Sequence, residues 1–196
     1  MRINKLEYQK KDKNRVNVYV DGEFVVGVDV NDVLKLNLYK DKELSQEDTK
    51  NLVDQSKFGK LFNFALNFLS FRPRSEWEIR MRLKRKFGKD SGAVQNDVVN
   101  KLKQINQIDD EVFAKWFVEQ RNTFRPKGKR AIAMELRRFG VKIKVENDIS
   151  ETELAKRALK KYHGEKVREK IARFLASRGF NWDTIESVVA RLQKRE

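Results

Sequence analysis

Residues 71–75 read Phe-Arg-Pro-Arg-Ser, and 53 positions later residues 124–128 read Phe-Arg-Pro-Lys-Gly. These two segments hold both prolines of the chain. Proline lacks an amide hydrogen and disfavours helical geometry in the residue before it, so each segment should end a helix. A leucine follows each proline at the same distance, as Leu83 and Leu136. We therefore predict two copies of one helical unit.

The residues after each proline have the apolar period of helices. Ser75 and Glu78 form a capping-box pattern, which is typical of a helix start. A weaker third copy, without the proline, ends near Gly179. The expected fold class is mainly α, with tandem three-helix repeats that form an elongated chain. The expected repeats span residues 59–106, 107–150 and 151–196.

The first part of the chain has a different pattern. Apolar residues alternate with others at positions 16–20 and again at positions 24–28, and Asp21-Gly22 between them favours a type I′ turn. This pattern predicts a β-hairpin, with a third strand near Leu6. The apolar residues after this hairpin, such as Val33, Leu34 and Leu38, have helical spacing. We expect residues 1–58 to form a small α+β extension, a β-hairpin plus helices.

The composition narrows the class of protein. The 196 residues contain no cysteine and one histidine, His163, which argues against a zinc ribbon, an iron–sulfur site or a disulfide framework. We expect no cofactor. No apolar run approaches the roughly 18 residues that span a bilayer, and no signal-peptide pattern follows Met1. We expect a soluble, cytoplasmic protein that does not bind membranes.

The formal net charge of +15 is concentrated after residue 60. Residues 1–60 contain 12 basic and 11 acidic residues, whereas residues 61–196 contain 32 and 18. A concentrated positive surface attracts polyanions, so nucleic acid, an acidic protein groove and an anionic membrane are the candidate partners. Apolar stripes committed to the repeat cores disfavour the membrane. The alternative is a charged face that only keeps the protein in solution.

The candidate binding residues surround the two prolines. A rigid turn that carries two cations binds phosphate or carboxylate at low entropic cost. Because the apolar stripes lie on other helix faces, we expect these cations to face outward and form a basic ridge. The predicted partner-binding or DNA-binding residues are Arg72, Arg74, Arg80, Lys84, Arg121, Arg125, Lys127, Lys129, Arg130, Arg137 and Arg138.

Aromatic residues interleave with these cations. Exposed rings could stack on the bases of single-stranded nucleic acid. Their spacing matches the apolar stripes of the predicted helices, which favours core packing instead. The phenylalanines concerned are Phe71, Phe87, Phe124 and Phe139.

The stretch Asp109-Asp110-Glu111 allows two interpretations. Clustered carboxylates could hold a catalytic metal in a nuclease, but Asp is also preferred at helix N-caps, and an apolar periodic run follows here. We favour the cap. The sequence has no second carboxylate group at a suitable spacing, no glycine-rich phosphate loop and no nucleophile elbow. We therefore predict no metal site and no catalytic residue, and the chain does not read as an enzyme.

Several motifs occur together in a specific order. Residues 72–76 read Arg-Pro-Arg-Ser-Glu, residues 108–111 read Ile-Asp-Asp-Glu, and Gly140-Val141 follows the second unit. Residues 18–24, Val-Tyr-Val-Asp-Gly-Glu-Phe, add a further match. Over most of its length the chain resembles the bacterial RecX family of regulatory proteins. The resemblance implies tandem three-helix repeats and a longer member with an N-terminal extension.

The resemblance also implies a function, inhibition of the recombinase RecA in homologous recombination, DNA repair and the SOS response. It implies a protein that lodges in the groove of the RecA filament on single-stranded DNA, suppresses ATP hydrolysis and strand exchange, and favours filament loss. We expect the protein to be a monomer. Charge alone supports an alternative. The chain could bind DNA, single- or double-stranded, or RNA without sequence preference and compete for the strand.

Overall fold

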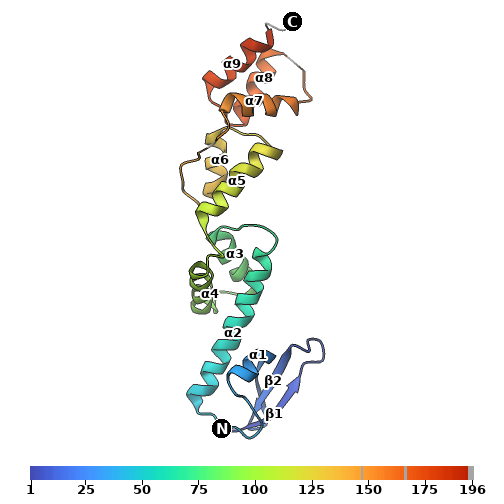
Figure 1. Ribbon diagram of the computed structural model, residues 1–196, viewed down its shortest axis with the longest axis vertical. Helices are drawn as coiled ribbons and strands as arrows, with labels where there is room; N and C mark the ends of the chain where they lie inside the picture. Colours follow the sequence, from blue (N-terminus) through green and yellow to red (C-terminus); the bar gives the residue numbers. More distant parts are fainter. Residues whose placement is uncertain (147, 166, 194–196) are drawn as a thin grey trace. The chain divides into compact units, whose positions relative to one another are not determined.

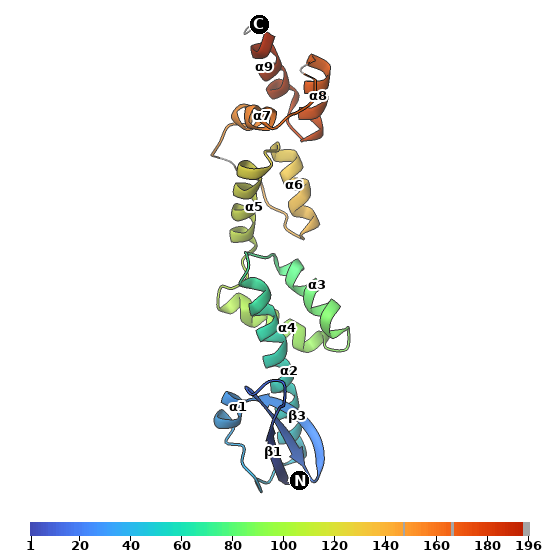
Figure 2. The same ribbon diagram turned by 90° about the vertical axis from the view of Figure 1, so that its right-hand side faces the viewer.

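The computed structural model describes residues 1–146, 148–165 and 167–193 of the chain. The described residues are mainly helical, with a small sheet near the N-terminus (Figures 1 and 2). This architecture confirms the predicted fold class. The chain divides into two compact units. The first comprises residues 1–71 and 79–107, and the second comprises residues 72–78 and 108–196.

The sheet of the first unit is antiparallel, with the strand order β1–β2–β3. Its alternating residues Val16, Val18 and Val20 are buried, as the period of two predicts. Asp21 and Gly22 have φ angles of 50° and 93°, which match the predicted type I′ turn. The predicted hairpin and third strand are both present. The strands are β1 (Ile3–Tyr8), β2 (Arg15–Val20) and β3 (Glu23–Asp29).

Two helices follow the sheet, the short α1 (Val30–Lys35) and the long α2 (Gln46–Leu69). Ser45 starts α2 through a capping box with Asp48. In the middle of α2, the Ser56 hydroxyl donates a hydrogen bond to the Gly27 carbonyl of β3, 2.6 Å away. Because this bond is buried, it ties α2 to the sheet and makes the extension part of the first unit.

Helix α3 (Glu76–Phe87), from residue 79 onward, and helix α4 (Gly92–Gln104) complete the first unit. Leu83 of α3 and Leu102 of α4 are buried there. The Phe87 ring meets Phe64 of α2 edge to face, with ring centres 5.3 Å apart. The apolar stripe predicted for α3 therefore packs against α2.

Besides residues 72–78, the second unit contains α5 (Asp110–Phe124) and α6 (Lys129–Arg138). Phe113, Ile132 and Leu136 are the fully buried centre of this pair. Their spacing places them on one face of each helix, as the repeat predicts.

Residues 141–146 differ from the expected pattern. We expected three helices in residues 107–150, but the described part of this range contains two, α5 and α6. Gly140, with a φ of 78°, ends α6, and the β-branched residues Val141, Ile143 and Val145 follow. β-Branched side chains lower helix propensity. Val141 and Val145 are nevertheless buried against α5 and α6, so a non-helical segment covers the core there.

The chain continues with α7 (Glu151–Lys160), α8 (Arg168–Ser177) and α9 (Trp182–Gln193). Leu154 and Leu175 lie at the centre of their shared core. No helix in the described residues combines the length and apolar character needed to cross a membrane.

Candidate nucleic-acid and partner interface

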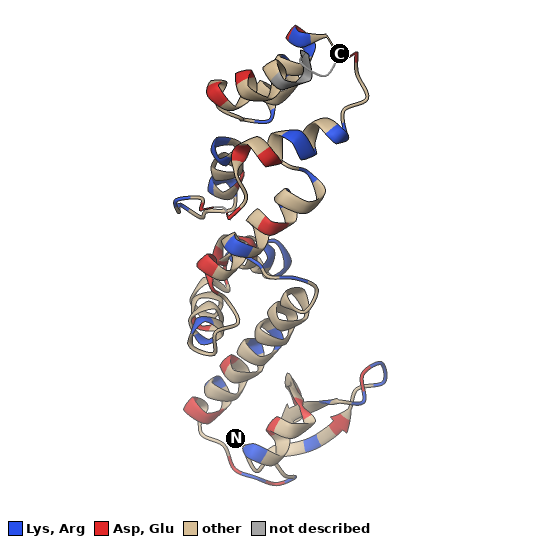
Figure 3. Ribbon diagram, turned by 45° about the horizontal axis from the view of Figure 1, so that its top comes forward, with Lys and Arg blue, Asp and Glu red and all other residues tan. Residues whose placement is uncertain are grey.

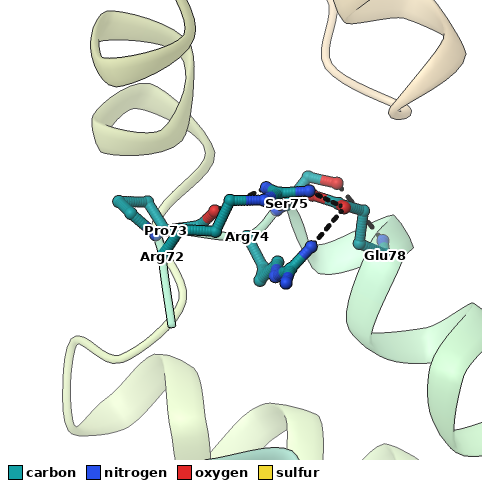
Figure 4. A network of polar contacts seen from close by, with 5 residues as sticks. All are labelled: Arg72, Pro73, Arg74, Ser75 and Glu78. Atoms are coloured by element: carbon teal, nitrogen blue, oxygen red, sulfur yellow. Dashed lines mark hydrogen bonds and ion pairs between the residues drawn. The ribbon is translucent and has the colours of Figure 1, made fainter. Parts of the chain in front are cut away.

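One carboxylate organises the first proline corner, residues 72–75 (Figure 4). The Arg72 guanidinium donates two hydrogen bonds to Glu78, with Nη2 2.6 Å from Oε1 and Nη1 3.1 Å from Oε2. Arg74 Nη1 lies 3.3 Å from the same Oε1. The Arg74 and Glu78 side chains are only 15% and 10% exposed. Charge-assisted contacts in such a shielded position are strong and directional.

Glu78 also closes the predicted capping box of α3. Its carboxylate accepts a hydrogen bond from the Ser75 amide at 3.3 Å, and the Ser75 hydroxyl accepts one from the Glu78 amide at 3.2 Å. The predicted outward orientation of Arg72 and Arg74 is wrong, because this single carboxylate lies within reach of both guanidiniums. The Arg72 guanidinium also covers the Trp116 ring, 5.2 Å from its centre. Binding of a partner by these residues stays a prediction.

The second proline corner, residues 125–128, repeats this chemistry with another carboxylate. Arg121 Nε lies 2.6 Å from Glu135 Oε2, and Lys127 Nζ lies 2.5 Å from Oε1. Burial would raise the pKa of Glu135, but hydrogen bonds from Lys127 and Arg121 hold that pKa below its ordinary value. Lys127 and Arg121 are partly shielded, and the outward orientation predicted for them is also wrong.

The two corners differ in the position of the carboxylate. Glu78 lies in the first turn of α3, close to the arginine that precedes Pro73. Glu135 lies in the second half of α6, so it reaches Arg121 and Lys127 instead. As a result Arg125, the sequence counterpart of Arg72, is exposed, and in the described part of the chain its side chain makes no ion pair.

The remaining predicted cations fall into two groups. Arg80 donates a hydrogen bond from Nη1 to Asn96 Oδ1 at 2.7 Å and so joins α3 to α4. The others are exposed, and among the residues that the structure describes their side chains take part in no ion pair. Figure 3 marks in blue where lysine and arginine occur along the ribbon. This exposed set, called the free cations below, comprises Lys84 on α3, Arg125 before Pro126, and Lys129, Arg130, Arg137 and Arg138 on α6.

A groove of about 540 Å³ lies beside the second proline corner, within the second unit. Two of its cations, Lys161 and Arg178, were missed by the sequence reasoning. Arg178 directly precedes Gly179, the glycine that ends the third copy, and this neighbourhood was a usable signal. Lys161 had no local signal. The groove is lined by Phe124, Arg125, Lys127, Lys161, Phe174, Ser177 and Arg178.

The predicted core position of the four phenylalanines holds for two of them. Phe87 packs against Phe64, and Phe139 packs against Phe113. Phe71 and Phe124, however, are 76% and 63% exposed. Phe71 follows the end of α2 and Phe124 is the last residue of α5, and their exposure shows that the core interpretation is wrong for this pair.

The acidic stretch at 109–111 acts locally. The Asp109 carboxylate accepts hydrogen bonds from the Glu111 and Val112 amides at 2.7 and 3.1 Å, which confirms its predicted role as the N-cap of α5. Asp110 accepts one from the Glu76 amide at 2.9 Å. Among the described residues, no three His, Asp or Glu side chains lie close enough together to hold a metal ion.

The fold and the free cations define a class of protein: a basic chain in which small helical domains follow an N-terminal sheet in the sequence. Four family models match it in order. They are the RecX N-terminal domain over residues 1–45, and the first, second and third RecX three-helix domains over residues 62–91, 109–142 and 152–189.

Full-length relatives agree with these matches. Regulatory protein RecX of Clostridium perfringens is 33% identical, with 100% of this chain and 98% of the relative covered. Regulatory protein RecX of Finegoldia magna is 32% identical, with 96% and 98% covered. The chain belongs to the RecX family, which is named for regulation and not for an enzymatic activity.

Solved structures show the same fold. A crystal structure of regulatory protein RecX matches with a TM-score of 0.67 at 25% identity, covering 100% of this chain and 99% of the other. RecX from Lactobacillus salivarius matches with a TM-score of 0.51 at 24% identity, covering 70% and 97%.

Proposed function

We propose that this protein is a negative regulator of RecA. It binds the RecA filament on single-stranded DNA in the cytoplasm and suppresses ATP hydrolysis and strand exchange. The observation that carries this proposal is the full-length match to proteins named Regulatory protein RecX, with all four RecX domains in order. The protein acts as a monomer, and its action needs no catalytic residue and no cofactor.

The free cations supply the binding surface in this proposal. The α6 helix alone presents Lys129, Arg130, Arg137 and Arg138, all exposed and without an ion pair in the described structure. Such cations attract a polyanionic nucleoprotein and speed encounter with it. Several domains on one chain then add weak contacts through effective concentration. Blocking an interface is sufficient for inhibition.

The paired cations have a different role. Arg72, Arg74, Arg121 and Lys127 are held on Glu78 and Glu135, so each pair of cations shares one compensating negative charge. We assign them to the shape of the corners, which keeps the exposed cations in place.

The test is the rate of ATP hydrolysis by RecA on single-stranded DNA, titrated with this protein at constant salt. The titration is repeated with a large excess of additional single-stranded DNA. Inhibition below one molecule per RecA that persists in excess DNA is the expected result. Inhibition that needs saturation of the DNA and disappears with excess DNA would contradict the proposal and favour a sequence-independent strand binder.

A further inference from the structure

The groove beside the second proline corner has the chemistry of a nucleotide site. Of its seven lining residues, four are cations, two are phenylalanines and none is acidic. Its volume of about 540 Å³ falls within the range of small-ligand sites. The feature lies entirely within the second unit, so its geometry depends on that unit alone.

A close backbone contact builds the groove. The Gly128 amide donates a hydrogen bond to the Arg178 carbonyl at 3.0 Å. A Cβ at Gly128 would collide with the Gly179 carbonyl, so only glycine permits this approach. The contact holds the turn after Pro126 against the end of α8, and so brings residues 50 positions apart in sequence to one surface.

The cations of the groove are held in position by neutral partners. Lys161 Nζ donates to the Phe124 and Thr123 carbonyls at 2.9 and 3.3 Å. Arg178 Nη1 donates to the Pro126 carbonyl at 3.4 Å, and its guanidinium covers the Phe174 ring at 4.6 Å. Carbonyl and ring contacts orient a cation without cancelling its charge. Lys127, which shares Glu135, is the exception among the groove cations.

The aromatic side of the groove is open. Phe124 is 63% exposed, although a large apolar ring at a helix end costs free energy when it faces water. A nucleobase has a flat face that stacks on such a ring, whereas an acidic peptide uses the cations only. The combination of oriented cations with an exposed ring therefore favours nucleic acid over an acidic peptide.

We propose that this groove binds one nucleotide of single-stranded DNA or RNA, with a backbone phosphate on Arg125, Lys161 and Arg178 and the base stacked on Phe124. This inference deepens the proposed function, because it places the nucleic-acid contact of a filament regulator at a defined site. Phosphate contact gives affinity, and stacking on a phenylalanine is tolerant of sequence.

The experiment measures binding of fluorescein-labelled oligo(dT) of about 15 nucleotides by anisotropy, without RecA, at several salt concentrations. We expect Phe124→Ala to weaken binding about tenfold. Arg125→Gln should weaken it and lower the salt slope by about 0.7, the value for one single-strand phosphate. Phe124→Leu, which keeps the apolar bulk, should lose nearly as much affinity as Phe124→Ala.

Matched controls lie outside the groove. Phe71 is the sequence counterpart of Phe124 and is exposed, and Lys142 is an exposed cation, so Phe71→Ala and Lys142→Gln should change affinity by less than about twofold. Failure of the parent to bind oligo(dT), or equal losses in groove and control variants, would overturn the inference. A further result would also overturn it: poly-glutamate binds in a way that depends on Arg125, and oligo(dT) binding is unchanged in Phe124→Ala.

The RecA assay separates this inference from the proposed function. A Phe124→Ala variant that loses oligo(dT) but still inhibits RecA supports the groove and leaves filament regulation intact. A parent protein that binds oligo(dT) through Phe124 but never inhibits RecA supports the groove and contradicts the regulator.

Discussion

At the scale of single residues, two carboxylates hold the corners of this protein. Glu78 gathers Arg72 and Arg74, and Glu135 gathers Arg121 and Lys127. Removal of one partner from a shielded network leaves the other charges without compensation, which is more costly than the loss of a surface pair. Each corner therefore depends on one side chain.

We expect Glu78→Gln to lower the free energy of unfolding by about 1–3 kcal/mol, because it leaves two guanidiniums without their anion. Urea unfolding followed by circular dichroism measures the change. Glu43→Gln is the matched control, since Glu43 pairs with Arg2 in an exposed position, and we expect a change below about 0.5 kcal/mol. Equal effects of the two substitutions would show that the corner network adds no stability.

The lowered pKa of Glu135 makes its contribution pH-dependent. A carboxyl whose pKa is lower in the folded state stabilises the fold above its unfolded-state pKa, near 4.5, and loses this contribution as pH falls through the folded-state pKa. The difference in unfolding free energy between the parent and Glu135→Gln should be constant near neutral pH and shrink below about pH 4.5. Urea unfolding from pH 7 to 3 tests this, and a pH-independent difference would contradict it.

At the scale of elements, the contact between the α5–α6 turn and the α8–α9 turn decides the geometry of the second unit. Gly128 and Gly179 let the two backbones meet there, and the Gly128 amide donates a hydrogen bond to the Arg178 carbonyl across the contact. Any side chain at Gly128 must displace backbone, which cannot rearrange as a flexible side chain can.

We expect Gly128→Ala to destabilise the protein by about 1–3 kcal/mol through this collision. It should also disrupt the groove and weaken oligo(dT) binding. Gly92→Ala is the control, because a Cβ at Gly92 at the start of α4 meets no atom within 4 Å. Thermal unfolding of both variants checks the prediction, which fails if Gly128→Ala is as stable as Gly92→Ala.

At the scale of the whole molecule, net charge is distributed unevenly between the N-terminal extension and the helical domains. Nearly all of the +15 excess belongs to residues 61–196, and α6 holds the densest set of free cations. The long-range attraction of a polyanion depends on the total charge of the protein, whereas binding at a defined contact depends on where the cations lie. Charge reversal at two places on the chain separates these effects.

We expect Arg137→Glu with Arg138→Glu to raise the concentration for half-inhibition of RecA ATP hydrolysis by about tenfold or more. The same change in net charge at Lys11 and Lys13, both exposed in the β1–β2 turn, should have a much smaller effect. The titration described above measures both, with melting temperatures as a check on folding. Similar losses in the two variants would mean that inhibition follows net charge alone.

The sequence by itself determined the local elements of this protein. Pro73 and Pro126 end helices through their own covalent geometry. Ser45 and Ser75 each cap a helix by accepting a hydrogen bond from the amide three residues later. Asp21-Gly22 forms the turn of the hairpin. These signals act within a few residues, so they can be read without a fold. The family resemblance likewise rests on short motifs in order, and the domain boundaries given above stay a prediction.

Only the tertiary structure decided which cations are free. Arg121 and Glu135 are 14 residues apart, and Lys161 lies 37 from the Phe124 carbonyl that holds it. Such pairings depend on how helices pack, so equivalent positions such as Arg72 and Arg125 reach opposite outcomes. Residues 141–146 show the same limit, because the burial of Val141 and Val145 against α5 and α6 depends on packing between segments. Electrostatic pairing depends on distance in space, and the order of residues along the chain does not contain that distance.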